Sequence, residues 1–378
     1  MTEEKKVYTT ALIGAGARGV DQLAGRAVAT GRFRFVAVCD PSQDGREFFK
    51  SRISRDVREF ESFDDLMAWN DFDVAVITSP DFAHEAQAGA CLEAGKDLLL
   101  EKPIAISHAG GTRVVEAAER NKRVVVVGFV LRYAPLYARA KELVDQGWIG
   151  KLTTIWVLHS VKSGSDWYFH DWHGTFANTG GLLLQKGSHD FDIINWFAGS
   201  RVQQVSAIGS RDVFGGDKPN GLRCPQCGER HACPERMPDD HPRTQCAFRR
   251  EIDCLDNHMV LMEFENGVKA SYDECHYTPD DNREYIFIGT KGKLKLDDRA
   301  GKLTMELRHS GDVMEYRPSA GREGHGGGDP RLIEDLAHAI DSRTQPLAGV
   351  KAGLESIRVG LMAHESIRRD GQVVRDLE

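Results

Sequence analysis

Residues 7–19 read VYTTALIGAGARG, an apolar run that leads into Gly14, Gly16 and Gly19. GxGxxG between an expected strand and an expected helix predicts a tight turn, where the backbone approaches a pyrophosphate at the helix N-terminus. Asp40 closes the next apolar run, at the spacing of a ribose-binding carboxylate. An ordinary turn and a strand-end aspartate would explain either feature alone, but not their joint spacing. The stretch therefore predicts a dinucleotide-binding domain.

The charge of Asp40 also bears on which dinucleotide is preferred. A carboxylate that faces the adenosine ribose repels a 2′-phosphate, so Asp40 predicts NAD over NADP. Arg18, inside the glycine-rich stretch, could soften that preference by attracting the phosphate.

The N-terminal part of the chain alternates short apolar runs with helical patterns. The runs expected to be strands are residues 7–13, 33–39, 74–78, 97–100 and 124–127. Near-continuous apolar strands separated by helices indicate a parallel sheet covered on both faces. We expect an α/β fold that begins with a doubly wound Rossmann domain over residues 1–150.

After residue 150 the pattern changes to longer alternating segments, which indicate a mostly antiparallel sheet with one wetted face. One helix interrupts them, with Ser188 as the expected N-cap and Gly199 just past its end. Helical periodicity returns from Pro330 onward. We expect an α+β domain over residues 151–378, built on a large open sheet.

Composition narrows the class of partner. The chain has 378 residues and a formal net charge of -8, so nucleic acid and anionic membrane surfaces are not expected partners. The longest apolar run, VVVVGFV at residues 124–130, is far shorter than the roughly 20 residues of a membrane span. The charged start MTEEKK shows no signal-peptide pattern. We expect a cytoplasmic protein that binds a small molecule.

A Glu-Lys-Pro turn, residues 101–103, follows the fourth expected strand, at the sheet edge where open α/β sheets bind ligands. With GAGARG and this turn, the chain resembles the Gfo/Idh/MocA oxidoreductase family over essentially its whole length, in a branch with a cysteine-rich insertion at about residues 212–256. Further matching positions are Thr78–Pro80 with His84, Gly95–Lys96, Arg132–Tyr133, Gly147–Gly150, Gly180–Gly181 leading into Lys186, His189 and Asp192, and GTKGKL at 289–294.

The resemblance implies a sugar or polyol substrate held between the two domains. It also implies that the open C-terminal sheet mediates a homo-oligomer, a dimer or tetramer. In this family the proline of the turn is commonly cis, which would aim Lys102 rigidly.

Oxidation of a secondary hydroxyl needs a base for the hydroxyl proton and a group that stabilises developing alkoxide charge. His189, expected near a helix N-terminus that disfavours imidazolium, suits the base, and Lys102 the stabilising donor. Many relatives carry an aspartate four residues before the histidine, whereas this chain has Gln185 followed by Lys186. Lys186 is therefore a third catalytic candidate. The competing interpretations are a helix-face histidine and a surface lysine.

The remaining candidate residues fall into two groups. The residues expected to bind the cofactor are Gly14, Gly16, Ala17, Arg18, Gly19, Asp40, Ser79, Pro80, His84, Glu101, Lys102 and Arg132. The residues expected to bind substrate are Tyr133, Tyr168, His170, Trp172, Gln185, Asp192 and His325. The aromatic stretch 166–173 suits the apolar face of a sugar, but it could equally be a packed loop.

Four cysteines, Cys224, Cys227, Cys233 and Cys246, lie in a Pro- and Gly-containing segment with little apolar sequence. Four thiolates match tetrahedral zinc, which would order such a segment and leave no position for catalytic water. An iron–sulfur cluster and free or disulfide-forming thiols are the alternatives.

Three functions remain open. The leading one is net NAD-dependent oxidation of a sugar, sugar acid or polyol. The second, known in this family, is redox-neutral glycoside cleavage, in which tightly bound NAD oxidises the sugar transiently, typically at C3, before elimination and water addition. It needs a further acid–base group, for which Tyr168, His170, His173 and Glu274 are available. The third is an NAD-dependent sensor without catalysis.

Overall fold

The structure is a computed structural model that describes residues 6–162, 164–319 and 324–377, with the side chains of the last range described from residue 326. Packing divides the chain into two units. Unit 1 comprises the chain up to Ala138 together with Ser319–Ile357, and unit 2 comprises Arg139–Pro318 and Arg358–Glu378. The division by packing thus falls at residue 138 and assigns a C-terminal segment to unit 1, whereas the domain boundary at residue 150 stays a prediction.

Unit 1 is built on a six-stranded parallel sheet in the order β3-β2-β1-β4-β5-β6. The strands are β1 (Tyr8–Ile13), β2 (Phe33–Cys39), β3 (Arg58–Phe60), β4 (Val74–Ile77), β5 (Asp97–Leu100) and β6 (Val125–Val127). β4, β5 and β6 are buried at every position, as expected of strands covered on both faces. The doubly wound fold predicted from the sequence is confirmed.

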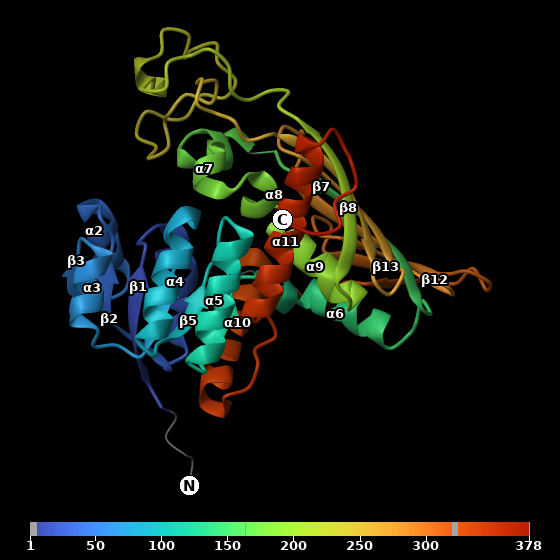
Figure 1. Cartoon of the computed structure of the whole chain (residues 1–378), viewed down its shortest axis with the longest axis horizontal. Helices are drawn as coiled ribbons and strands as arrows, with labels where there is room; N and C mark the ends of the chain where they lie inside the picture. Colours follow the sequence, from blue (N-terminus) through green and yellow to red (C-terminus); the bar gives the residue numbers. More distant parts are fainter. Residues whose placement is uncertain (1–5, 163, 320–323, 378) are drawn as a thin grey trace. The chain divides into compact units, whose positions relative to one another are not determined.

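Helical segments connect these strands, and Figure 1 shows α4 and α5 running alongside the sheet. They are η1 (Arg18–Ala24), α1 (Gly25–Ala29), α2 (Gln43–Arg52), α3 (Phe63–Trp69), η2 (Asp81–Ala83), α4 (His84–Glu93), α5 (His108–Arg120) and η3 (Val130–Tyr133). Serines at positions 42, 62 and 107 cap α2, α3 and α5 by accepting a backbone N–H. α10 (Gly324–Ser342) and the first part of α11 (Val350–Arg368) complete unit 1.

Unit 2 is built on an eight-stranded sheet in the order β14-β13-β12-β11-β7-β10-β9-β8. The strands are β7 (Leu152–Ser160), β8 (Val202–Ser210), β9 (Asn257–Phe264), β10 (Lys269–Cys275), β11 (Asn282–Gly289), β12 (Gly292–Asp297), β13 (Lys302–Leu307) and β14 (Val313–Tyr316). β7 and β10 pair in parallel and the other neighbours are antiparallel. This matches the open, mostly antiparallel sheet that we expected.

The two faces of this sheet differ. Burial alternates along β7, β9 and β10, so one face is covered and the other meets solvent. The helical segments of unit 2 are η4 (Ser165–Phe169), η5 (Trp172–Gly174), α7 (Phe176–Thr179), α8 (Leu182–Gln185), α9 (Ser188–Ala198) and the end of α11, while α6 (Pro135–Asp145) begins in unit 1. Beyond β8, Figure 1 shows residues 212–256 mainly as coil, with the short helix η6 (Cys224–Gln226).

Two local expectations differ from the structure. Gly187, not Ser188, is the N-cap of α9, because Ser188 already has helical geometry. The last helical region begins at Gly324 rather than at Pro330, which lies inside α10. The end of α9 at Gly199, with a φ of 60°, is as predicted.

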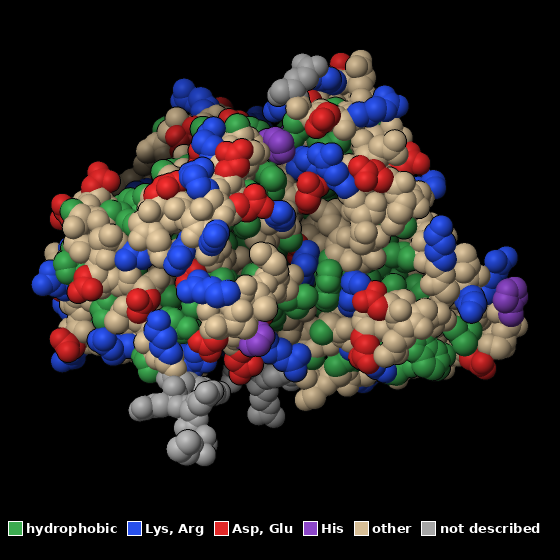
Figure 2. All heavy atoms as spheres, turned by 60° about the horizontal axis from the view of Figure 1, so that its bottom comes forward, with side chains coloured by type: hydrophobic (Ala, Val, Ile, Leu, Met, Phe, Trp, Pro, Cys, Tyr) green, Lys and Arg blue, Asp and Glu red, His purple; other side chains and the backbone are tan. Residues whose placement is uncertain are grey.

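Within the described part of the chain, no helix is both long and apolar enough to cross a membrane. Figure 2 shows basic and acidic side chains interspersed over the visible face.

Candidate functional site

The glycine-rich loop after β1 packs tightly against the loop after β4. Gly14 has a φ of +88°, and a Cβ there would lie 2.5 Å from the backbone nitrogen of Ser79. The Thr78 hydroxyl donates to the Gly14 carbonyl at 2.6 Å. At Gly19, a Cβ would lie 2.4 Å from the same Thr78 hydroxyl. Packing within the protein therefore explains the first and third glycines of the motif.

The middle glycine is different. A Cβ at Gly16 would have no heavy atom within 4 Å, and the residue has no left-handed backbone conformation that would favour glycine. The fold itself has room for a side chain at this position. A group that approaches the backbone from outside, such as a pyrophosphate, explains why none is present. The loop therefore fits a dinucleotide.

Asp40 lies at the end of β2 against the same loop. One carboxylate oxygen accepts from the Ala15 amide at 2.7 Å, and the other accepts from the Ser42 amide at 2.8 Å. A carboxylate oxygen has more than one acceptor position, so both oxygens can still receive a ribose hydroxyl. This position beside the glycine loop is the one that a ribose-binding carboxylate needs.

Arg18 is engaged by two carboxylates. Its Nε donates to Glu101 at 2.6 Å and its Nη1 donates to Asp329 at 2.7 Å. Asp329 is fully buried, so Arg18 supplies the charge that this carboxylate needs. The expectation that Arg18 softens the preference for NAD is weakened, because its guanidinium is already committed to anions of the protein.

The Glu-Lys-Pro turn follows β5 at the carboxyl edge of the sheet. The peptide bond between Lys102 and Pro103 is cis, as the resemblance implied. The two ring nitrogens of His84 lie 2.7 Å from the Pro103 carbonyl and 2.8 Å from the Ser79 carbonyl. Burial lowers the pKa of His84, while these two carbonyls oppose the shift. His84 thus links the loop after β4 to the turn.

Other predicted residues of unit 1 make contacts within the protein. The Ser79 hydroxyl donates to Gln87 at 2.5 Å, and Arg132 donates to the Leu347 carbonyl at 2.8 Å. The Tyr133 hydroxyl, predicted to bind substrate, donates to Asp335 at 2.7 Å. Each of these groups would have to share or exchange a partner to reach a ligand.

In unit 2, the predicted catalytic residues lie where α8 ends and α9 begins. Gln185 closes α8, Lys186 follows it, and His189 is the second residue of α9. Lys186 and His189 are half-buried, whereas Gln185 and Asp192 are buried. Burial lowers the pKa of Lys186 to about 8, and Arg283 contributes in the same direction. An amine with this pKa can exchange protons near neutral pH.

Asp190, which the sequence did not single out, is a buried carboxylate with several partners in the first turn of α9. It accepts hydrogen bonds from Tyr285, from Tyr272 at 3.1 Å and from Arg283 at 2.9 Å. The His159 Nδ1 lies 2.8 Å away. These charged and polar neighbours hold the pKa of Asp190 well below its usual range despite the burial that opposes this. Asp190 therefore anchors the start of α9 to the sheet.

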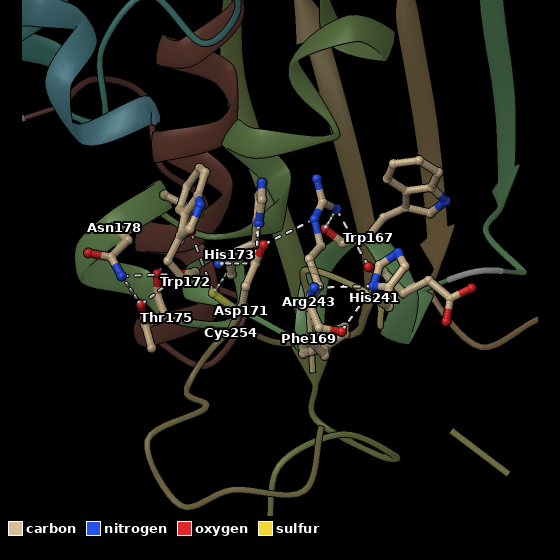
Figure 3. A network of polar contacts seen from close by, with 12 residues as sticks. Trp167, Phe169, Asp171, Trp172, His173, Thr175, Asn178, His241, Arg243 and Cys254 are labelled. Atoms are coloured by element: carbon tan, nitrogen blue, oxygen red, sulfur yellow. Dashed lines mark hydrogen bonds and ion pairs between the residues drawn. The ribbon is translucent and has the colours of Figure 1, made fainter. Parts of the chain in front are cut away.

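The aromatic stretch 166–173 packs against the segment 212–256. Figure 3 shows Asp171 between His173 and Arg243, with Arg243 beside Trp167. The Arg243 guanidinium lies 5.1 Å from the Trp167 ring centroid, and Trp172 stacks on His173 with ring centroids 3.6 Å apart. Much of the polar and aromatic surface of this stretch therefore contacts protein, which favours the packed-loop interpretation for these residues.

Four of the five cysteines of segment 212–256, namely Cys224, Cys227, Cys233 and Cys246, line one cavity together with His170. The His170 Nδ1 lies 2.5 Å from the Gln245 carbonyl. All eight cysteines of the chain are free thiols. Among the residues that the structure describes, however, no group of three or more His, Cys, Asp or Glu side chains is arranged to hold a metal ion. The sequence thus correctly grouped the four thiols, but the expected zinc is not supported by their arrangement.

Each unit thus gathers part of the predicted site. Unit 1 brings the glycine loop, Asp40 and the Lys102 turn together, and unit 2 brings Lys186 and His189 together. His170 lies with the cysteines rather than with Lys186, and the side chain of His325 is outside the described residues. Sequence reasoning missed Asp190, His159 and Arg283, because partners on separate strands leave no local spacing signal.

Two family models match the chain. Residues 8–129 match the NAD-binding Rossmann fold of the Gfo/Idh/MocA oxidoreductase family, and residues 141–374 match the C-terminal alpha/beta domain of that family. Inositol 2-dehydrogenase 2 of Saccharopolyspora erythraea is 32% identical over 313 residues, which is 82% of this chain and 77% of that protein. YteT of Bacillus subtilis (strain 168) is 27% identical over 346 residues, with 79% and 80% covered.

Solved structures share the fold. A levoglucosan dehydrogenase in complex with NADH and levoglucosan superposes with a TM-score of 0.80 at 16% identity, covering 99% of this chain and 100% of that one. Aldose-aldose oxidoreductase from Caulobacter crescentus gives a TM-score of 0.75 at 19% identity, with 98% and 100% covered. The chain belongs to the Gfo/Idh/MocA family and is an NAD(P)-dependent oxidoreductase, with a Rossmann domain followed by a C-terminal alpha/beta domain.

Proposed function

We propose that this enzyme oxidises a secondary hydroxyl of a sugar, sugar acid or polyol by hydride transfer to NAD. The observation that carries the proposal is the placement of the Lys102 turn beside the glycine loop, to which the hydrogen bond between Arg18 and Glu101 ties it at 2.6 Å. The turn that carries Lys102 therefore starts beside the loop that fits a dinucleotide, which supports a role for the Lys102 ammonium at the cofactor. Alkoxide stabilisation needs a cation near the hydride acceptor.

The relatives support the substrate class. One relative is named an inositol dehydrogenase, and one structural neighbour holds levoglucosan and NADH. Both names indicate polyhydroxylated rings. NAD is preferred over NADP in this proposal, because Asp40 faces the loop and Arg18 is occupied by Glu101 and Asp329.

The proposed chemistry divides between three residues. His189 accepts the hydroxyl proton, Lys102 donates a hydrogen bond to the oxygen as negative charge develops, and Lys186 contributes a second amine. NAD, when bound, supplies the acceptor for the hydride that leaves the carbinol carbon. The products are a ketone, NADH and one proton, so atoms and charge balance. The proposal requires Lys102 and His189 to act on the same carbinol.

Further substrate contacts are part of the proposal. Tyr168, Gln185 and Asp192 are retained as substrate-binding residues because they belong to the unit that carries Lys186 and His189. Tyr133, His170, Trp172 and His325 complete the proposed substrate contacts. The cofactor-binding set, which includes Ala17, Ser79, Pro80, His84, Glu101 and Arg132, also stays a proposal.

A second candidate function is redox-neutral glycoside cleavage with NAD retained on the enzyme. Two observations favour this second function. Gln185 cannot take a proton where many relatives have an aspartate, and the carboxylate of Glu274 is buried among histidines in the same unit as Lys186. Elimination needs such an additional acid–base group.

One experiment separates the two functions. The purified protein is incubated with NAD and a panel of free sugars, polyols and aryl glycosides while NADH and released aglycone are followed together. Accumulating NADH supports the dehydrogenase, whereas aglycone release without net NADH supports the glycosidase. If neither NADH nor aglycone appears with any compound of the panel, both functions are contradicted and a sensor is favoured. In whichever reaction is found, Lys186→Met should lower turnover at least about tenfold, and unchanged kinetics would exclude Lys186 from catalysis.

The solvent-facing side of the unit 2 sheet supports a homo-oligomer, either a dimer or a tetramer. Five large apolar side chains on this side are at least half exposed: Trp156, Leu158, Ile208, Met259 and Leu261. An exposed apolar patch of this kind is typical of an interface. Light scattering should give a multiple of 42.0 kDa, and Leu261→Glu should shift it toward the monomer. A monomeric wild type would contradict the oligomer.

We also propose that the chain belongs to a branch of the family with a cysteine-rich insertion and that the insertion holds a structural zinc. The shared cavity of Cys224, Cys227, Cys233 and Cys246 supports this, although the thiols would have to close around the ion. Elemental analysis of the purified protein should find about one zinc per chain. A chain free of zinc and iron would remove the metal.

A further inference from the structure

A row of ionisable side chains crosses the covered face of the unit 2 sheet. In the strand register, His258 of β9 lies opposite Glu274 of β10, Glu274 lies beside His159 of β7, and His159 lies opposite Arg283 of β11. Residues opposite one another on neighbouring strands project to the same face. His258, Glu274 and His159 are at most 3% exposed. Four neighbouring strands thus place two buried histidines, a buried carboxylate and a partly buried guanidinium side by side.

The two carboxylates near this row are in different situations. Asp190 accepts three hydrogen bonds and also lies against His159, so its charge is fully compensated. Glu274 lies 3.3 Å from the His276 Nε2 and 3.5 Å from the His258 Nδ1. Within the described part of the chain, neither oxygen of Glu274 completes a hydrogen bond of good geometry, and the ring nitrogens of His258 and His276 also lack one.

Burying these groups without full hydrogen bonding lowers the stability of the fold. An uncompensated buried carboxylate destabilises a fold by several kcal/mol, which makes unsatisfied groups candidates for function. The pKa of Glu274 is held below its usual range by His276 and His258 against the opposing effect of burial. His364, whose ring lies 6.0 Å from that of His258, has its pKa lowered to about 3 by burial and stays neutral. Glu274, ionised at neutral pH, therefore supplies the negative charge of the cluster.

The cluster lies close to Lys186. The ring of His276 packs edge-on against Tyr168 at a centroid distance of 5.1 Å, and the Lys186 Nζ lies 5.5 Å from the centroid of the Tyr168 ring. Burial and Arg283 lower the pKa of Lys186, while Glu274 raises it. The charged and titratable groups that face Lys186 are Tyr168 of η4, His159 of β7, Asp190 of α9, Glu274 of β10, Asp281 before β11 and Arg283 of β11.

We propose that Glu274, held between His258 and His276, is a positioning residue that controls the charge on the Lys186 ammonium. Asp190 is saturated by its partners and supplies a fixed charge. Glu274 contacts imidazoles without completing a hydrogen bond to them, so its negative charge is less compensated and acts on Lys186. This inference rests on the proposed function only in giving Lys186 a part in turnover. The electrostatic coupling between the two side chains does not depend on the substrate.

The test measures the charge of Lys186 without turnover. Lysines are acylated with a trace of acetic anhydride at pH 7, and the rate at Lys186 is read by mass spectrometry relative to the exposed Lys351, because only the uncharged amine reacts. Glu274→Gln removes the negative charge that favours the ammonium, so Lys186 should react at least about 2.5-fold faster, equivalent to a fall of about half a pKa unit. Asp273→Asn, on the opposite face of the same strand, is the matched control and should leave the rate unchanged.

A second variant covers the case in which Glu274→Gln does not fold. His276→Gln removes an imidazole that compensates the carboxylate, so the Lys186 ammonium is favoured and labelling at pH 7 should become slower than in the wild type. Equal Lys186 rates in Glu274→Gln and Asp273→Asn, or an unchanged or faster rate in His276→Gln, would overturn the inference. If the proposed oxidation fails but the labelling shifts occur, the coupling stands and only the assigned reaction is wrong.

If both the coupling and the proposed oxidation are correct, one limb of the pH profile of kcat should also move in Glu274→Gln. Glu274→Gln lowers the pKa of Lys186, so the limb that reports the titration of this amine moves toward lower pH. This holds whether the reaction needs the amine or the ammonium. A purely structural role for Glu274 would lower kcat at all pH values without moving the limb.

Discussion

Gly16→Ala tests whether glycine is required at position 16 by a bound ligand rather than by the fold. No heavy atom lies within 4 Å of the position that the new methyl group would occupy, and the backbone there does not need glycine. The substitution should therefore leave the native structure unstrained. It also reduces the conformational entropy of the unfolded chain, which stabilises a protein by about 0.4–1 kcal/mol.

The same methyl group would lie where we expect the pyrophosphate to approach the backbone. NAD affinity should fall at least about tenfold, which corresponds to about 1.4 kcal/mol of binding free energy. Isothermal titration calorimetry measures the affinity, and denaturant unfolding measures the stability. Gly89→Ala is the matched control, because Gly89 lies in α4 and a Cβ there also has no heavy atom within 4 Å. It should give a similar stability gain with unchanged affinity.

Gly14→Ala completes the comparison. Its Cβ would lie 2.5 Å from the Ser79 backbone at a φ of +88°, so this variant should lose stability as well as affinity. Unchanged NAD affinity in Gly16→Ala would refute the reasoning, since the open space at residue 16 would then have no ligand to explain it.

Two further predictions concern buried charges. Arg18→Met removes the guanidinium that pairs with Glu101 at 2.6 Å and Asp329 at 2.7 Å, so the free energy of unfolding should fall by about 3 kcal/mol in denaturant titrations. The exposed Arg113, replaced by Met, should cost less than about 1 kcal/mol, and equal losses would contradict a special role for Arg18. Asp190 has a depressed pKa, so its stabilising effect is present above its unfolded value near 4 and is lost as pH falls through the folded value. Asp190→Asn should lower Tm at pH 7, and Tm should then fall less steeply on acidification than in the wild type. If Tm of the variant falls as steeply with acid as Tm of the wild type, Asp190 is not the source of that fall.

The sequence predicted those parts of the fold whose signals are local. Strands β1, β2, β4, β5 and β6 appear as short apolar runs, and glycines mark the loop after β1. β3 was missed because its three residues, Arg58–Phe60, include two exposed charged side chains and carry no apolar run. β12, β13 and β14 were not identified as strands either. β12 and β13 do alternate apolar and polar residues, so the signal was present there, whereas β14 has only four residues.

The site was predictable only where one segment holds all its parts. The glycine loop, the Lys102 turn and the Lys186–His189 segment were found because each lies within a few residues. The Glu274 cluster was not, because its members come from β9, from β10 and its end, and from α11, and only strand register brings them together. The use of the Arg18 charge was also hidden, since Asp329 lies 311 positions further along the chain.

The central claim is that the imidazole at residue 189 takes the proton from a carbinol whose hydride goes to NAD. The most direct measurement is single-turnover NADH formation by His189→Gln on the substrate found in the panel, with NAD affinity measured on the same sample. We predict a rate at least about a hundredfold below the wild type, the usual contribution of a general base, at unchanged NAD affinity. A rate within a fewfold of the wild type would contradict the claim.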